Sequence, residues 1–128
     1  MKFSIILLCL FSHFVFSQDI PSPNPIETFV EREAEFPGGS GALAKFINDN
    51  IVFPQEVINK KLKGRVTLRF VVEQDGSITN VSVTNPIKSC EACSTEAINV
   101  VTRMPNWKPG SIKGKEVRTW VMLPIRFE

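Results

Sequence analysis

The sequence predicts an α+β fold of two layers, in which an N-terminal helix and a crossover helix pack on a three-stranded sheet of antiparallel type. Two patterns predict it. Apolar residues recur at spacings of three and four in residues 40–50 and 94–104, which is typical of amphipathic helices. In residues 65–72 and 116–127 they alternate with polar residues instead, which is typical of half-buried strands. A chain of 128 residues has room for one domain of this kind.

The N-terminal helix is expected to follow a turn at residues 36–39, which have the sequence Phe-Pro-Gly-Gly. Ser40 is a suitable N-cap, because its hydroxyl can accept a hydrogen bond from a free N–H of the first turn. A Phe-Pro pair at residues 53–54 ends this segment. A second short helix is predicted over residues 55–61, and Gly64 is expected to stop it.

A β-hairpin is predicted in the middle of the chain. Its first strand covers residues 65–72, and the Asp-Gly pair at residues 75–76 is a strong signal for a tight turn. The second strand covers residues 78–85. Its apolar spacing breaks strict alternation near the start, so we expect a β-bulge near residues 79–80.

The crossover helix is expected to begin at Ser94 or Thr95 and to end before Pro105. Its apolar face consists of Ala97, Ile98, Val101 and Met104. The last strand then covers residues 116–127. A crossover helix returns this third strand beside the first, so the predicted order across the sheet is second, first, third. The third strand is expected to lie at an edge.

The first residues have the features of a cleavable export signal. Lys2 supplies the positive start, a mostly apolar stretch follows, and Ser17 offers a small residue at the cleavage point. The apolar stretch is shorter than the about 20 residues that a membrane-spanning helix needs. The predicted organisation is a signal peptide at residues 1–17, a short proline-containing acidic leader at 18–35 and a domain at 36–128.

Charge and residue content exclude several classes of function. The chain has 15 basic and 13 acidic residues, a near balance that gives no attraction to nucleic acid. His13 is its one histidine and lies in the predicted signal. The mature chain therefore cannot hold a histidine-based nucleophile or a metal site that contains histidine. No catalytic residue, metal or cofactor is expected.

Cys90 and Cys93 have the spacing of redox dithiols, and the start of a helix can lower the pKa of a thiol. Two cysteines cannot complete a zinc site of four ligands. In an oxidising compartment a local disulfide is the simpler interpretation. Unpaired thiols and a thiol–disulfide oxidoreductase are the alternatives.

Six short motifs follow one another along the chain with suitable gaps. They are Phe-Pro-Gly-Gly at 36–39, Phe-Pro at 53–54, Gly-Arg-Val at 64–66 with Phe-Val-Val at 70–72, Asp-Gly-Ser-Ile at 75–78, Met-Pro-Asn-Trp-Lys-Pro-Gly at 104–110 and Leu-Pro-Ile-Arg-Phe at 123–127. No single motif is decisive. Taken in order over residues 35–128, they resemble the TonB C-terminal domain family in the version common in Bacteroidetes.

The resemblance implies a function. TonB proteins carry energy from a proton-driven inner-membrane complex to outer-membrane receptors, and their C-terminal domain grips a short receptor segment, the TonB box, which adds to the last strand. The expected product is therefore a periplasmic protein-binding module and not an enzyme, with a TonB-dependent outer-membrane receptor as its partner. If residues 1–17 stayed on the chain as an inner-membrane anchor, the ExbB/ExbD complex would be a second partner. An accessory or sensor domain that binds another envelope protein is the alternative.

Pro124 indicates which residues would meet that segment. Successive residues of a strand direct their N–H and C=O groups to opposite edges, and proline has no N–H to offer a neighbouring strand. If the last strand is an edge, Pro124 faces the open side, and Arg118, Trp120 and Met122 face it too. The side chain of Trp120 could then cover the bound segment; the alternative is that it packs under the helix at residues 40–50.

Overall fold

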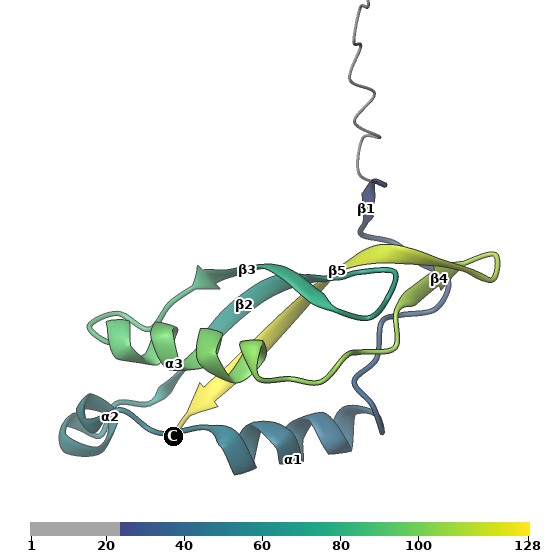
Figure 1. Cartoon of the computed structure of the whole chain (residues 1–128). Coiled ribbons are helices and arrows are strands. Elements are labelled where there is room, and N and C mark those ends of the chain that lie inside the picture. The colour runs from purple at the N-terminus through teal and green to yellow at the C-terminus, as the bar shows by residue number, and fades with distance from the viewer. Residues whose placement is uncertain (1–23) are drawn as a thin grey trace, which may run out of the picture.

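The computed structural model describes residues 24–128 (Figure 1). The predicted signal peptide, residues 1–17, lies outside the described residues. In chain order the elements are β1 (Ile26–Glu27), α1 (Ser40–Asn50), α2 (Gln55–Lys60), β2 (Gly64–Val72), β3 (Ile78–Asn85), α3 (Glu91–Thr102), β4 (Gly110–Ile112) and β5 (Lys115–Phe127). This content agrees with the predicted α+β class.

The sheet has five strands in the order β1-β5-β2-β3, with β4 paired to β5 outside this path. β2 runs antiparallel to β3 and β5, whereas β1 runs parallel to β5. The prediction of three strands is therefore wrong, and β5 is not a wholly free edge. β1 and β4 have two and three residues, which is too short for an alternating pattern to be visible in the sequence.

β4 and the start of β5 form a second hairpin between α3 and the main part of β5. Lys113 and Gly114 close it with φ angles of 51° and 76°. Two consecutive positive φ angles are typical of the tight turns that match the twist of antiparallel strands.

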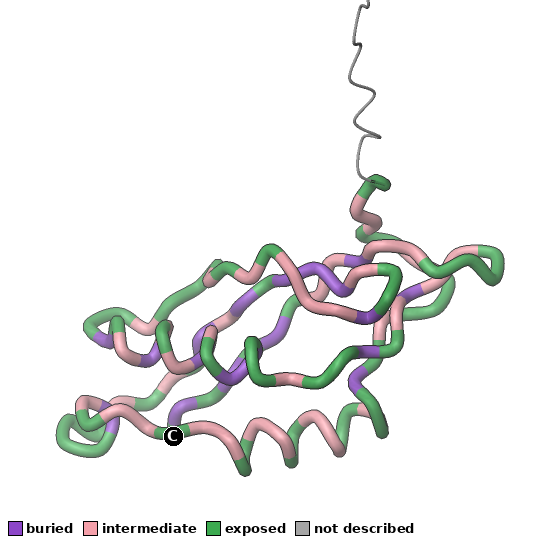
Figure 2. Tube along the Cα trace, in the orientation of Figure 1, coloured by how far each residue is buried: buried purple, intermediate pink, exposed green. Residues whose placement is uncertain are grey.

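The core lies between one face of the sheet and the helices. From β2 and β5 it takes Val66, Leu68, Phe70, Val72, Leu123, Ile125 and Phe127. From α3 it takes Cys93, Ala97, Val100 and Val101. Figure 2 shows the buried positions following the paths of β2 and β5. The three helices all lie on this side of the sheet, so none of them covers its other face (Figure 1).

The β2–β3 hairpin turns at the predicted Asp-Gly pair. Asp75 Oδ1 accepts hydrogen bonds from the backbone N–H and the hydroxyl of Ser77, at 2.9 and 2.6 Å. Gly76 has a φ of 88°, and a Cβ there would lie 2.2 Å from the carbonyl oxygen of Trp107. The Trp107 N–H donates to the Gly76 carbonyl at 2.8 Å. The glycine therefore lets the loop after α3 dock against the hairpin.

The predicted β-bulge near residues 79–80 is confirmed. The register between β2 and β3 shifts between Arg69 and Val71, which lie opposite Ser82 and Thr79. Asn80 adopts a φ of 53°, a left-handed conformation that asparagine tolerates better than most residues. The extra residue of the bulge is therefore on β3.

The predicted start of α1 and the predicted end of α2 both need correction. The N-cap of α1 is Gly39, not Ser40, and its φ of 88° and ψ of −170° belong to a region that essentially only glycine occupies. α2 ends before Lys61, whose φ of 50° and ψ of 40° are left-handed. Gly64 is not the stop and is the first residue of β2.

α3 begins earlier than expected. Its first residue is Glu91, whereas Ser94 or Thr95 was predicted to start it. The N-cap is Cys90, whose Sγ accepts a hydrogen bond from the N–H of Cys93 at 3.2 Å. Cysteine is not a usual capping residue, and for this reason the earlier start could not be predicted from the residues.

Candidate functional site

The candidate site is the edge of β5 that faces away from β2. β2 pairs with β5 along residues 119–127. Pro124 lies within this ladder, and because it has no N–H its backbone groups should face away from β2. Residues of the same parity face the same way. Trp120 and Met122 should therefore offer their backbone N–H and C=O groups to the open side.

β1 occupies the start of this edge. Ile26 lies opposite Arg118 and Glu27 lies opposite Thr119. Of the four predicted partner-binding residues, Arg118 is thus already covered by a strand, contrary to the expectation of a free edge. Within residues 24–128 no strand pairs with the remainder of the edge, residues 120–127.

Arg118 is also held through its side chain. Its Nε and Nη2 donate to the carboxylate of Glu73 at 2.6 and 3.1 Å, and its Nη1 donates to the carbonyl oxygen of Asn24 at 2.9 Å. The hydrogen bonds from Arg118 hold the pKa of the Glu73 carboxyl below its ordinary value, although partial burial acts in the opposite direction. Arg118 therefore joins the start of β1 to the end of β2.

Trp120 lies on the face of the sheet without helices. The guanidinium carbon of Arg69 is 4.3 Å from the centroid of its ring, which is within the range of a cation–π interaction. Val71 lies opposite Trp120 and is fully buried on this face. The alternative that Trp120 packs under α1 is wrong, because the apolar side chains of α1 pack on the opposite face.

The same face offers apolar and cationic groups beside the open edge. Met122 is 64% exposed, and Pro124 is exposed too. Arg65 and Arg126 lie directly opposite each other and border a hollow of about 270 Å³. Like charges in direct opposition destabilise a sheet. Glu128 lies at the rim of this hollow, and its Oε1 is 3.5 Å from Arg126 Nη1.

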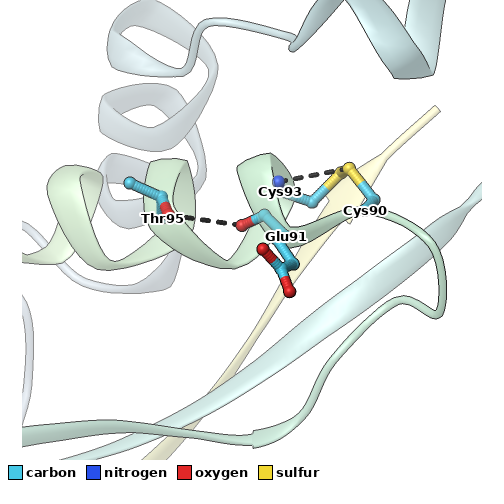
Figure 3. The surroundings of a disulfide bond; sticks show 4 residues. All are labelled: Cys90, Glu91, Cys93 and Thr95. Carbon is cyan, nitrogen blue, oxygen red and sulfur yellow. Dashed lines mark hydrogen bonds between the residues drawn. A yellow bond between two sulfur atoms is a disulfide. The ribbon is translucent and has the colours of Figure 1, made fainter.

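Cys90 and Cys93 form a disulfide at the start of α3 (Figure 3). They are 1% and 0% exposed and belong to the core. Thiol–disulfide exchange requires that an external thiolate reach one of the sulfurs. The native fold gives no such access, so this geometry favours a structural bridge over an oxidoreductase.

Two aromatic residues of the motifs are packing elements. Trp107 is 5% exposed, and its ring meets that of Phe70 edge-on with centroids 5.3 Å apart. The Phe53 ring lies 5.9 Å from that of Phe127, the last core residue of β5. Neither is placed at the open edge.

The described part of the chain contains neither a cluster of metal-ligating side chains nor a membrane-spanning helix. Over residues 24–128, His, Cys, Asp and Glu side chains do not form any group of three or more that could hold a metal ion. Nor does this stretch contain a helix long and apolar enough to cross a membrane.

The chain was compared with models of known protein families, and part of it matches one of them. A family model described as the Gram-negative bacterial TonB protein C-terminal matches residues 49–128. This range runs from the end of α1 to the end of β5 and includes the whole open edge. None of the curated proteins matches the chain.

Proposed function

Because the chain belongs to the family of Gram-negative bacterial TonB protein C-terminal domains, we propose that residues 36–128 form a periplasmic module that binds TonB-dependent outer-membrane receptors by strand addition. Domains of this family belong to proteins of the Gram-negative envelope and are associated with energy-coupled transport, not with catalysis.

The observation that carries the proposal is the edge of β5, of which β1 covers only Arg118 and Thr119. Residues 120–127 are paired with β2 on one side, and on the other side no strand of the described chain accompanies them. An unpaired edge of this length offers backbone donors and acceptors that an extended peptide can satisfy. β2 is fixed in turn by β3, so the incoming strand would add to a rigid sheet.

The side chains on the helix-free face indicate which segment would fit. Alternate residues of an added strand point to this face, where they would lie near Trp120 and Met122. Apolar side chains suit these neighbours. Arg65, Arg69 and Arg126 lie on the same face, so an acidic side chain placed near Arg126 would be favoured by charge. The structure therefore fits an extended segment with apolar residues and at least one acid.

The experiment is calorimetric titration of synthetic peptides that copy the N-terminal segments of TonB-dependent receptors. Met122→Pro removes one N–H from the open edge, so it should weaken binding at least tenfold while the urea unfolding midpoint stays near that of the native chain. Met122→Ala is the matched control, because it truncates the side chain and keeps the N–H. Undiminished affinity of the proline variant would show that recognition does not use this edge.

Export is part of the same proposal and concerns residues 1–17. We expect cleavage after Ser17 and release of the product into the periplasm, as the short apolar stretch favours. Mass spectrometry of the envelope fraction measures the mature N-terminus. Recovery of the intact chain in washed inner membranes would instead favour an anchored protein, for which the ExbB/ExbD complex becomes a partner.

A further inference from the structure

The short strand β1 lies on the same edge of β5 that the proposed function assigns to the receptor segment. It is the chain's own leader, and it pairs with Arg118 and Thr119 in parallel orientation. Asn24 adds two contacts to this arrangement: its carbonyl accepts from Arg118 Nη1 at 2.9 Å, and its Nδ2 donates to Gln74 Oε1 at 3.2 Å. The leader therefore already makes the kind of pairing that a partner strand would make.

The pairing of β1 with β5 is weak because few backbone groups take part in it. The strand has two residues, both only half-buried. Pro25 precedes it and has no N–H to give to β5. The carbonyl of Glu116, further back along β5, accepts instead from Gln74 Nε2 at 3.3 Å. A strand this short is marginal without support from other contacts. Here the support comes from the hydrogen bonds that join Asn24 to the side chains of Arg118 and Gln74.

The rest of the leader is attached independently. The N–H groups of Glu31 and Arg32 donate to the Ser111 carbonyl at 3.1 and 3.0 Å, and the Ser111 N–H donates back to Arg32 at 2.9 Å. Glu35 and Lys108 exchange two further backbone hydrogen bonds at 2.9 and 2.7 Å. β1 could therefore leave β5 while residues 31–35 remain in place.

The segment that connects β1 to the attached residues 31–35 is a short, exposed bend. Residues 28–30 link β1 to the attached segment, and the ring of Phe29 is 88% exposed. Such a bend can swing without breaking core contacts. A short tether also keeps β1 at high effective concentration beside the edge, so that it re-binds whenever the edge is empty.

We propose that β1 is a displaceable strand that competes with the incoming receptor segment for the start of the β5 edge. The proposal rests on strand addition at β5. With β1 in place, the available edge begins at Trp120. With β1 released it extends back to Arg118, and the longer edge binds more tightly. The leader thus sets the affinity of the domain for its partner.

One matched pair of variants tests the competition. Arg118 faces the open side, so in a parallel pair its backbone groups would bond to the two residues that flank Ile26. The N–H of Glu27 is then the one directed at β5, whereas that of Ile26 points outward. Glu27→Pro should release β1, and Ile26→Pro, which introduces the same ring one residue earlier, should not.

The measurement is the affinity of the full mature chain for the synthetic receptor peptides. If β1 is closed about nine-tenths of the time, its release in Glu27→Pro should tighten binding by up to about tenfold, the full factor applying if the closed state does not bind, with no change in Ile26→Pro. In parallel, hydrogen exchange of residues 24–30 in the native chain should speed up when peptide is added. Equal affinities of the two proline variants, together with unchanged exchange, would overturn the competition.

The two proposals fail in different ways. A peptide whose affinity drops in Met122→Pro but is the same in Glu27→Pro as in Ile26→Pro supports the edge and eliminates the competition. A peptide that binds Met122→Pro as well as the native chain eliminates the edge, and the competition with it. Failure of all peptides to bind either the native chain or Glu27→Pro also counts against both.

Discussion

The guanidinium carbon of Arg69 lies 4.3 Å from the centroid of the Trp120 ring, across the β2–β5 ladder and on the face that carries no helix. Arg69 is exposed, and Trp120 is only half-buried. The contact orients the indole beside the open edge of β5. It therefore connects the paired side of the sheet to the side on which we place the partner.

Arg69→Ala should remove this interaction and cost about 0.5–1 kcal/mol of stability, the usual size of a cation–π contact at an exposed site. Urea titration followed by circular dichroism measures the loss. Arg65→Ala is the control, because Arg65 lies on the same strand and face but opposite another cation, Arg126. An equal loss in the two variants would mean that the Trp120 contact contributes nothing of its own.

Leu68→Ala should cost about 2–5 kcal/mol, the range for truncation of a buried leucine. Leu68 is fully buried at the centre of β2, with β3 and β5 on either side. Thr67→Ala is a nearby comparison on the opposite face and should cost much less. A loss below about 0.5 kcal/mol for Leu68→Ala would place this side chain outside the cooperative core.

The main strands could be predicted from the sequence because one face of each is more deeply buried than the other. Leu68 and Phe70 are fully buried, whereas Arg69 between them is exposed, and this difference appears directly as alternation. The Asp75-Gly76 turn was also predictable, since few sequences satisfy its geometry. These local signals were sufficient to place the hairpin and the last strand.

β1 could not be predicted, because its position depends on tertiary contacts. Ile26 and Glu27 follow a proline and show no alternation over two residues. They are placed by Arg118, which reaches Asn24 from the far end of the chain. For the same reason the pairing of β1 with Arg118 could not be foreseen, while the Pro124 parity argument and the partner-binding role of the four residues remain predictions.

The ion pair between Glu73 and Arg118 should make stability depend on acid. Hydrogen bonding to Arg118 lowers the folded-state pKa of Glu73 below its usual 4.5. A carboxyl whose pKa is depressed by folding contributes stability above its unfolded pKa, and that contribution is lost as pH falls through the folded pKa. Urea midpoints measured from pH 6 to pH 3 should therefore fall less in Glu73→Gln than in the native chain.

The partner variant Arg118→Gln separates this pair from general acid effects. It should flatten the same part of the pH profile, and the double variant should be no flatter than either single variant, since residues in direct contact are not additive. If the two single effects simply add, the Glu73 carboxyl owes its lowered pKa to something other than Arg118.

The disulfide between Cys90 and Cys93 should resist reduction in the native state. Both sulfurs lie in the core, so dithiothreitol can attack only when the start of α3 opens, and the rate should rise with urea. A short peptide with the sequence Cys-Glu-Ala-Cys, oxidised, gives the rate for an accessible bridge. Once reduced, the domain should be less stable by about 2 kcal/mol, as expected for a bridge that closes a very short loop. If the native protein were reduced at the same rate as the peptide and urea had no effect on that rate, the sulfurs would be accessible. That result would favour the alternative of a thiol–disulfide oxidoreductase.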